Sequence, residues 1–171
     1  AQFSNIQVSF IPGVTAEPQA ISFAPIADRP VNSSALSLSA TASSGLPVSY
    51  QVISGPATLS GNSLTVTGLG TVTVRASQAG NLSFLAAPDV DQSFNVIKAP
   101  ATITLAALNP TYNGSQKSVT VTTTPASLPV IVTYDGSPTA PTNAGSYAVT
   151  ATIDDATYQG AVSDTLTIAK A

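Results

Sequence analysis

The sequence predicts an all-β protein made of two small antiparallel modules in tandem. Along most of the chain, apolar residues alternate with Ser or Thr, which is the pattern of strands with one buried face. Turn signals rich in Gly, Asn, Asp and Pro separate these stretches, and the chain holds 13 Pro and 11 Gly. Charged residues make up only 8%, so Ser and Thr must supply the polar faces. Strong helix formers such as Glu, Lys and Met are scarce or missing, so no helix is expected.

Residues 1–19 contain one strand-like stretch, Phe3–Phe10, in which Ile6, Val8 and Phe10 alternate with polar residues. A single strand cannot bury its own apolar face. We therefore interpret residues 1–19 as a leader strand and linker, the remnant of an upstream domain. Pairing of this strand with the first module is the alternative.

The first module, residues 20–98, shows six short strand patterns separated by turn signals such as Ser54-Gly55-Pro56. Short strands at such regular spacing are typical of an immunoglobulin-like (Ig-like) β-sandwich. The chain has no Cys and no Trp, so the disulfide and tryptophan core of antibody domains is excluded. The expected strands are Ile21–Ile26, Leu36–Thr41, Val48–Ile53, Leu64–Thr67, Thr71–Ser77 and Ser93–Ile97.

The second module, residues 99–171, has five strand patterns and two tight-turn signals, Asn113-Gly114 and Asp135-Gly136. So small a domain buries little surface, and tyrosines must supply the bulk of its core. The expected strands are Ile103–Ala106, Ser118–Thr123, Val130–Tyr134, Gly145–Ile153 and Thr165–Ala169. The tyrosines expected in the core are Tyr112, Tyr134, Tyr147 and Tyr158.

These motifs, in this order, resemble the MBG-type ("mostly β-grasp") repeat of large bacterial surface and secreted proteins. The resemblance covers residues 99–171 and implies a non-catalytic module, β-grasp-like or Ig-like, that occurs in tandem arrays. Residues 43–48, 55–57 and 70–80 are similar to the bacterial Ig-like repeats that precede MBG modules. The resemblance therefore implies an Ig-like module at residues 20–98 followed by an MBG module.

The two modules also share short sequence motifs. Leu-Pro-Val occurs at residues 46–48 and 128–130, and each module closes on an alternating strand that ends in Lys98 or Lys170. Motifs and closing strands that recur in this way are typical of tandem arrays. We expect the boundary at Lys98–Ala101, with Pro100 stiffening the connection and the modules arranged end to end.

The composition excludes several kinds of chemistry. The chain has no His and no Cys, so catalytic triads, imidazole bases and thiolate or histidine metal sites are impossible. The net charge is −3, and five scattered basic residues cannot neutralise a run of phosphates, so nucleic acid is not an expected partner. No apolar run reaches membrane-spanning length, and the start lacks a signal-peptide pattern. We expect no enzyme, no cofactor and no catalytic residue, in an internal fragment of an exported protein.

Two pairs of carboxylates are the remaining candidates for chemistry. Asp89 and Asp91 could bind Ca²⁺ through hard oxygen ligands, although they are better explained as turn residues. Asp154 and Asp155 also fall in an expected turn. Lys117, which follows the Asn113-Gly114 turn, and the strand-ending lysines lack the buried setting that an intramolecular Lys–Asn isopeptide bond requires.

The sequence is best interpreted as structural spacer or stalk repeats of a large, exported, adhesin-like bacterial surface protein. Its expected location is extracellular, at the cell surface, and its expected partners are the neighbouring modules of the same chain. Two alternatives stay open. One is an accessory module that binds carbohydrate or protein through loops at one end. The other is a fibre-forming subunit that assembles when the leader strand adds to a neighbour's sheet edge.

Overall fold

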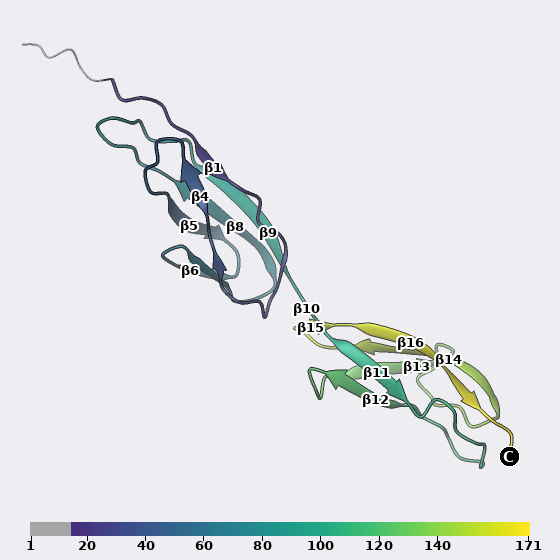
Figure 1. Cartoon of the computed structure of the whole chain (residues 1–171). Helices are drawn as coiled ribbons and strands as arrows, with labels where there is room; N and C mark the ends of the chain where they lie inside the picture. The colour runs from purple at the N-terminus through teal and green to yellow at the C-terminus, as the bar shows by residue number, and fades with distance from the viewer. Residues whose placement is uncertain (1–14) are drawn as a thin grey trace, which may run out of the picture. The chain divides into compact units, whose positions relative to one another are not determined.

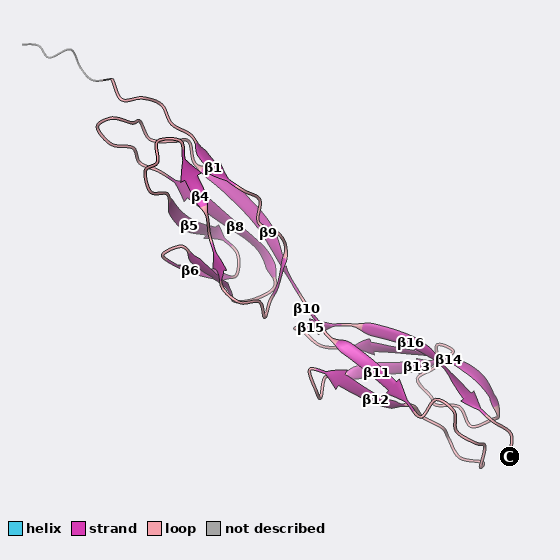
Figure 2. Cartoon of the chain, viewed as in Figure 1, coloured by secondary structure: helices cyan, strands magenta, loops and turns pink. Residues whose placement is uncertain are grey.

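The computed structural model describes residues 15–171, and the stretch Phe3–Phe10 lies outside the described residues (Figure 1). The described chain consists of strands and loops with no helix (Figure 2), so the all-β prediction is confirmed. It divides into two compact units. Unit 1 comprises residues 15–28 and 34–95, and unit 2 comprises residues 29–33 and 96–171.

The first nine strands form three sheets. A four-stranded sheet has the order β2-β9-β8-β5, a three-stranded sheet the order β3-β7-β6, and β1 pairs with β4. All these pairs are antiparallel except the short parallel contact of β2 with β9. The strands are β1 (Ile21–Phe23), β2 (Arg29–Pro30), β3 (Leu36–Ser37), β4 (Ala40–Ala42), β5 (Ser49–Ser54), β6 (Ala57–Ser60), β7 (Ser63–Val66), β8 (Gly70–Ser77) and β9 (Val90–Ile97).

The core of unit 1 follows from the alternation on β8. Val72, Val74 and Ala76 point inward and are fully buried, while the residues between them face outward. Leu64 of β7 and Phe94 of β9 are also buried, as the alternation predicts. Each such aliphatic side chain, removed from water, stabilises the fold by about 1.5–3 kcal/mol. The expectation that alternating apolar residues form one buried face is confirmed for these three strands.

Several strand predictions in the first module differ from the structure. The strand expected at Ile21–Ile26 ends at Phe23, and the one expected at Ser93–Ile97 begins at Val90. The stretch Leu36–Thr41 was expected as one strand, but it divides into β3 and β4, which belong to different sheets. Between them Leu38 is buried and donates its N–H to the carbonyl of Asn62, which bends the chain from one sheet to the other. Strand β6 was missed because it follows directly on the Gly55-Pro56 turn signal and its alternation is short.

Unit 2 contains a three-stranded antiparallel sheet, β13-β14-β16, a two-stranded antiparallel sheet, β11-β12, and a parallel pair, β10-β15. Its buried cluster is small and consists of Tyr134, Val149, Leu166 and Ile168, with Leu105, Val119, Val132, Ala140 and Tyr147 packed against it. The strands are β10 (Ala99–Pro100), β11 (Thr102–Ala106), β12 (Thr120–Thr124), β13 (Val130–Tyr134), β14 (Gly145–Ile153), β15 (Tyr158–Gln159) and β16 (Ala161–Ile168).

The tyrosines of unit 2 are not equally buried. Tyr134 is buried, as predicted, and its hydroxyl accepts the N–H of Val119 at 3.0 Å. Tyr147 is half-buried against the core and its hydroxyl donates to the carbonyl of Asn143. Tyr158 is also half-buried. The prediction was wrong for Tyr112, which is 38% exposed because it lies in the loop before β12, beside the Asn113-Gly114 turn.

Candidate functional site

The two carboxylates offered by the sequence as calcium ligands lie beside a guanidinium group. Both oxygens of Asp91, on β9, accept hydrogen bonds from Nε and Nη2 of Arg75, on β8, each at 2.8 Å. The carboxylate of Asp89 lies 3.5 Å from Nη1 of the same arginine. The sequence treated these residues as turn aspartates or cation ligands and missed the arginine. No group of three acidic side chains gathers to hold a metal ion anywhere in residues 15–171.

The Arg75 guanidinium lowers the pKa of Asp91, chiefly through the paired hydrogen bonds and then through its charge. A carboxyl with a lowered folded-state pKa contributes stability above its ordinary value, near pH 4, and that contribution is lost as the pH falls through the folded-state pKa. Because both side chains are exposed, solvent screening keeps the contribution small.

Asp91→Asn is therefore expected to flatten the acid limb of the stability curve below about pH 4, with little change at neutral pH. The measurement is the denaturant midpoint at a series of pH values. Arg75→Gln should remove the same portion of the acid limb, and the double variant should resemble either single variant. Additive effects of the two substitutions would contradict the pairing.

The second group of interest is the segment Lys98–Ala101, which leads from β9 to β11 and is here called incoming segment 2. It pairs in parallel with β15, and Ala99, fully buried, donates its N–H to the carbonyl of Thr157 at 2.8 Å. The N–H of Ala101 reaches the carbonyl of Gln159 at 2.9 Å. Lys98 Nζ donates to the backbone carbonyl of Asp155 at 2.6 Å.

Asp155 shapes the turn that receives incoming segment 2. Its Oδ1 accepts the backbone N–H groups of Thr157 at 2.7 Å and Tyr158 at 2.9 Å. These two bonds, in that order, lower the pKa of the carboxyl. The sequence places Asp154 and Asp155 in an expected turn, and the structure shows that the carboxylate of Asp155 caps this turn. Gly160 completes the turn, because a Cβ there would collide with the carbonyl oxygen of Ala101.

Unit 1 receives its own incoming segment, Ala16–Gln19, here called incoming segment 1, in the same way. Glu17 forms a parallel bridge with Phe84; its N–H bonds to the carbonyl of Ser83, and its carbonyl accepts the N–H of Leu85, both at 2.8 Å. Gln19 is buried and its Nε2 donates to the carbonyl of Leu85 at 2.7 Å. The sequence placed residues 15–19 in the leader, but these contacts make Glu17 and Gln19 part of unit 1.

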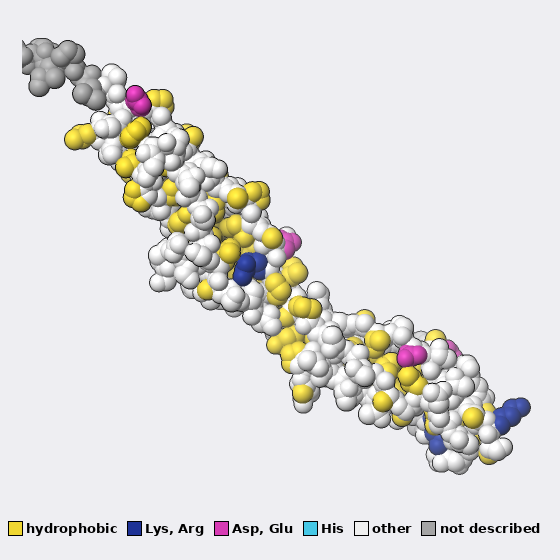
Figure 3. Space-filling model, viewed as in Figure 1, with side chains coloured by type: hydrophobic (Ala, Val, Ile, Leu, Met, Phe, Trp, Pro, Cys, Tyr) yellow, Lys and Arg dark blue, Asp and Glu magenta, His cyan; other side chains and the backbone are white. Residues whose placement is uncertain are grey.

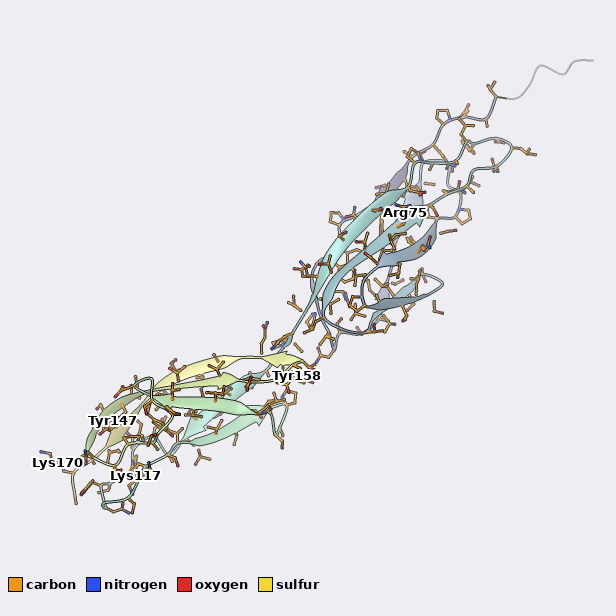
Figure 4. The ribbon with its side chains drawn as sticks, turned by 180° about the vertical axis from the view of Figure 1, so that it is seen from behind. Arg75, Lys117, Tyr147, Tyr158 and Lys170 are labelled. Atoms are coloured by element: carbon orange, nitrogen blue, oxygen red, sulfur yellow. The ribbon has the colours of Figure 1, made fainter. Side chains whose placement is uncertain are left out.

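The two incoming segments align in sequence, although their burial differs: Glu17 is exposed and its counterpart Ala99 is buried. The stretch Ala16–Phe23 matches Lys98–Leu105, with Pro18 opposite Pro100 in the comparison. Each stretch ends in an antiparallel strand, which is β1 in unit 1 and β11 in unit 2. Figure 4 shows Tyr158 at the end of unit 2 that receives the chain and Tyr147 toward the other end. Both units therefore contain a proline-bearing segment that is held by backbone hydrogen bonds just before a strand.

The surface of residues 15–171 carries scattered charges (Figure 3) and one hollow of interest. On the face shown in Figure 3, charged side chains are sparse and scattered among uncharged polar ones. A shallow hollow of about 350 Å³ lies beside β12. It is lined by Val121, Thr122, Thr123, Ala126, Ser127, Leu128 and Val130. Within residues 15–171 there is no helix long and apolar enough to cross a membrane.

Residues 101–171 match the family model of the MBG domain. The resemblance drawn from the sequence is confirmed for this segment, which is an MBG-type repeat. Together with the all-β fold, the match suggests an extracellular repeat module. A comparison with curated proteins gave no match.

Among solved structures, the chain is similar to two crystal structures of Drosophila N-cadherin. Against the EC1-3 structure the identity is 13% and the TM-score 0.34, with 92% of this chain and 70% of that chain covered. Against the EC1-4 structure the identity is 13% and the TM-score 0.33, with 89% of this chain and 50% of that chain covered.

Proposed function

We propose that this chain is a pair of non-catalytic spacer repeats from a large exported bacterial surface protein of adhesin-like type. The observation that carries the proposal is the shared way in which units 1 and 2 receive the chain. In each unit, backbone hydrogen bonds fix the residues just before a strand: β1 in unit 1 and β11 in unit 2. Connecting residues fixed in this way have few accessible conformations. A tandem array that acts as a spacer requires such restricted connections.

The composition supports the same proposal. Ser and Thr dominate the outward positions of the strands, and only 8% of the residues are charged. Hydroxyl groups keep such a surface hydrated without strong attraction to polyanions. Cores made of alternating aliphatic residues make each unit self-sufficient, so repeats can be added without redesigning their neighbours.

The spacer role is tested by the spread of distances between two labels, one on each unit. The chain has no native Cys, so Thr58→Cys on β6 and Thr122→Cys on β12, both exposed, give specific labelling sites. Pulsed electron spin resonance is expected to give a narrow distance distribution. The matched control inserts four Gly-Ser residues between Ile97 and Lys98, which should broaden the distribution. If the native chain already shows the broad distribution, the spacer proposal fails.

A binding role is the second candidate, and the hollow beside β12 is the observation that favours it. Saturable binding of a glycan or peptide to the native chain, lost in Leu128→Ser but kept in Ile131→Ser, would favour that role. Leu128 lines the hollow, whereas Ile131 is 55% exposed and is not among the lining residues, so the second variant is a matched control.

A further inference from the structure

The turn Asn113-Gly114 lies in the loop between β11 and β12, and the structure gives it an unusual chemical setting. Asn113 Oδ1 accepts two hydrogen bonds, from the N–H of Ser115 at 3.1 Å and from Lys117 Nζ at 2.6 Å. Both residues of the turn are exposed. Figure 4 shows Lys117 in this part of unit 2, near the end that also carries Lys170.

The backbone nitrogen of Gly114 follows this amide in the chain and becomes a nucleophile when its N–H loses the proton. Gly114 has φ +79°, and a Cβ built on it would meet no atom within 4 Å outside its two chain neighbours, so the space that a side chain would occupy is open. Within the described residues, the Gly114 N–H donates no hydrogen bond. Attack on the Asn113 side chain therefore breaks no ladder bond, and a glycine at the following position adds no side chain of its own to obstruct it.

We propose that Asn113 is a site of spontaneous deamidation that Lys117 promotes. The Gly114 nitrogen attacks Cγ of Asn113, and a five-membered succinimide forms. The bond from Cγ to Nδ2 breaks, and the side-chain nitrogen leaves as ammonia, taking up the proton released from the Gly114 nitrogen. One water molecule then opens the ring at either carbonyl and yields aspartate or isoaspartate. The step consumes one water, releases one ammonia and needs no oxidant or reductant.

Lys117 acts through the oxygen it already contacts. During the attack, negative charge develops on Oδ1, and a cationic donor 2.6 Å away stabilises that charge. The aspartate product carries a carboxylate in the same place, so there the lysine gains an ion-pair partner. The net charge changes from −3 to −4, because a neutral amide becomes an anion. Since the turn is exposed, the folded state is expected to survive the change.

Two other asparagines show why this position is special. Asn81 makes a comparable turn, with Oδ1 accepting the N–H groups of Ser83 and Phe84, but Leu82 follows it and crowds the nitrogen. Asn109 precedes Pro110, whose nitrogen has no hydrogen to release. Asn113 alone combines a following glycine with a lysine on its carbonyl oxygen within residues 15–171.

The experiment ages the folded full-length chain at mildly alkaline pH and follows it by mass spectrometry after digestion with trypsin. Cleavage at Lys98 and Lys117 gives the peptide 99–117, which contains Asn113 and, as an internal control, Asn109. Deamidation is expected at Asn113, with one labelled oxygen incorporated when the ageing is done in isotope-labelled water. Asn109 and Asn81 should stay amides over the same period. Equal conversion at all three asparagines, or none at Asn113, would overturn the proposal.

Lys117→Met tests the role of the lysine while keeping a side chain of similar length. The variant lacks the cleavage site at residue 117, so its tryptic peptide with Asn113 is 99–170. Deamidation of Asn113 in the folded variant is expected to be about threefold to tenfold slower than in the native chain. This effect is smaller than the loss of a donor at a buried oxyanion site, because the turn is exposed to water. In denaturant the native chain and the variant should convert at the same rate, since the contact is lost. A faster reaction in folded Lys117→Met would mean that the hydrogen bond protects Asn113, and the proposed promotion would be wrong.

A different product is distinguishable in the same digest. Attack by Lys117 Nζ on Cγ would also release ammonia, but it would leave an isopeptide bond and block cleavage after Lys117. That attack requires loss of the ammonium proton, and no carboxylate in the described chain forms an ion pair with Lys117 that could accept it. A missed cleavage with permanent loss of ammonia would replace the deamidation proposal with this cross-link.

Discussion

Replacing Tyr134 with Ala is expected to lower the free energy of unfolding of unit 2 by about 3–5 kcal/mol. Tyr134 is 6% exposed and belongs to a buried cluster with only three other members. The substitution removes the aromatic ring from this core and leaves the N–H of Val119 without the hydroxyl that accepts it. Small domains have a total stability of only about 5–15 kcal/mol, so the loss is a large share.

The measurement is hydrogen exchange of β14 amides in the full chain, because β14 is the central strand of the unit 2 sheet. Tyr134→Phe is the matched control: it keeps the ring and removes only the hydroxyl, so it should lower the stability by about 1 kcal/mol. Tyr147→Ala should be milder than Tyr134→Ala, because Tyr147 is half-buried. If Tyr134→Ala leaves exchange unchanged, the tyrosine does not hold this core together.

Strand positions with strict alternation could be predicted from the sequence alone. The bounds of β13 and β14 agree with the prediction residue for residue, because each strand pairs over its full length with a neighbour in one sheet. The inward face of β8 was also correct, since every second residue there is apolar and fully buried. In these strands the apolar alternation of the sequence matches the burial that the fold imposes. The strand can therefore be predicted from its own residues.

The short parallel pairs could not be predicted, because nothing local specifies them. Strands β10 and β15 have two residues each, too few for a periodic signal, and their partners are far apart in the sequence. The hydrogen bond from Lys98 Nζ to the carbonyl of Asp155 joins residues 57 positions apart, so it too depends on the strand pairing. Arg75 likewise meets Asp91 only because β8 and β9 are neighbours in their sheet. The sequence supplies the residues of both sites, and the strand pairing decides which of them meet.

Replacing Gly55 with Ala is expected to destabilise unit 1 by about 3 kcal/mol or more, which places it among severe substitutions. Two physical effects add. Gly55 has φ +95°, a conformation that L side chains rarely adopt, which accounts for roughly 1–2 kcal/mol. A Cβ there would also lie 2.7 Å from Val72 Cα and closer still to the carbonyl oxygen of Thr71. These are backbone atoms of β8, the strand that supplies the fully buried core residues, and they cannot move without disturbing it.

Gly61→Ala is the control that separates the two effects. Gly61 also has positive φ, +61°, but its Cβ would meet nothing within 4 Å, so only the backbone strain applies, about 1–2 kcal/mol. Both variants are compared with the native chain by denaturant melts, with hydrogen exchange of β8 amides reporting on unit 1. The difference between the variants measures the collision with β8. Equal losses would mean that β5 and β8 can separate at this point without disturbing the core. The close approach of Gly55 to β8 would then contribute nothing to the stability of unit 1.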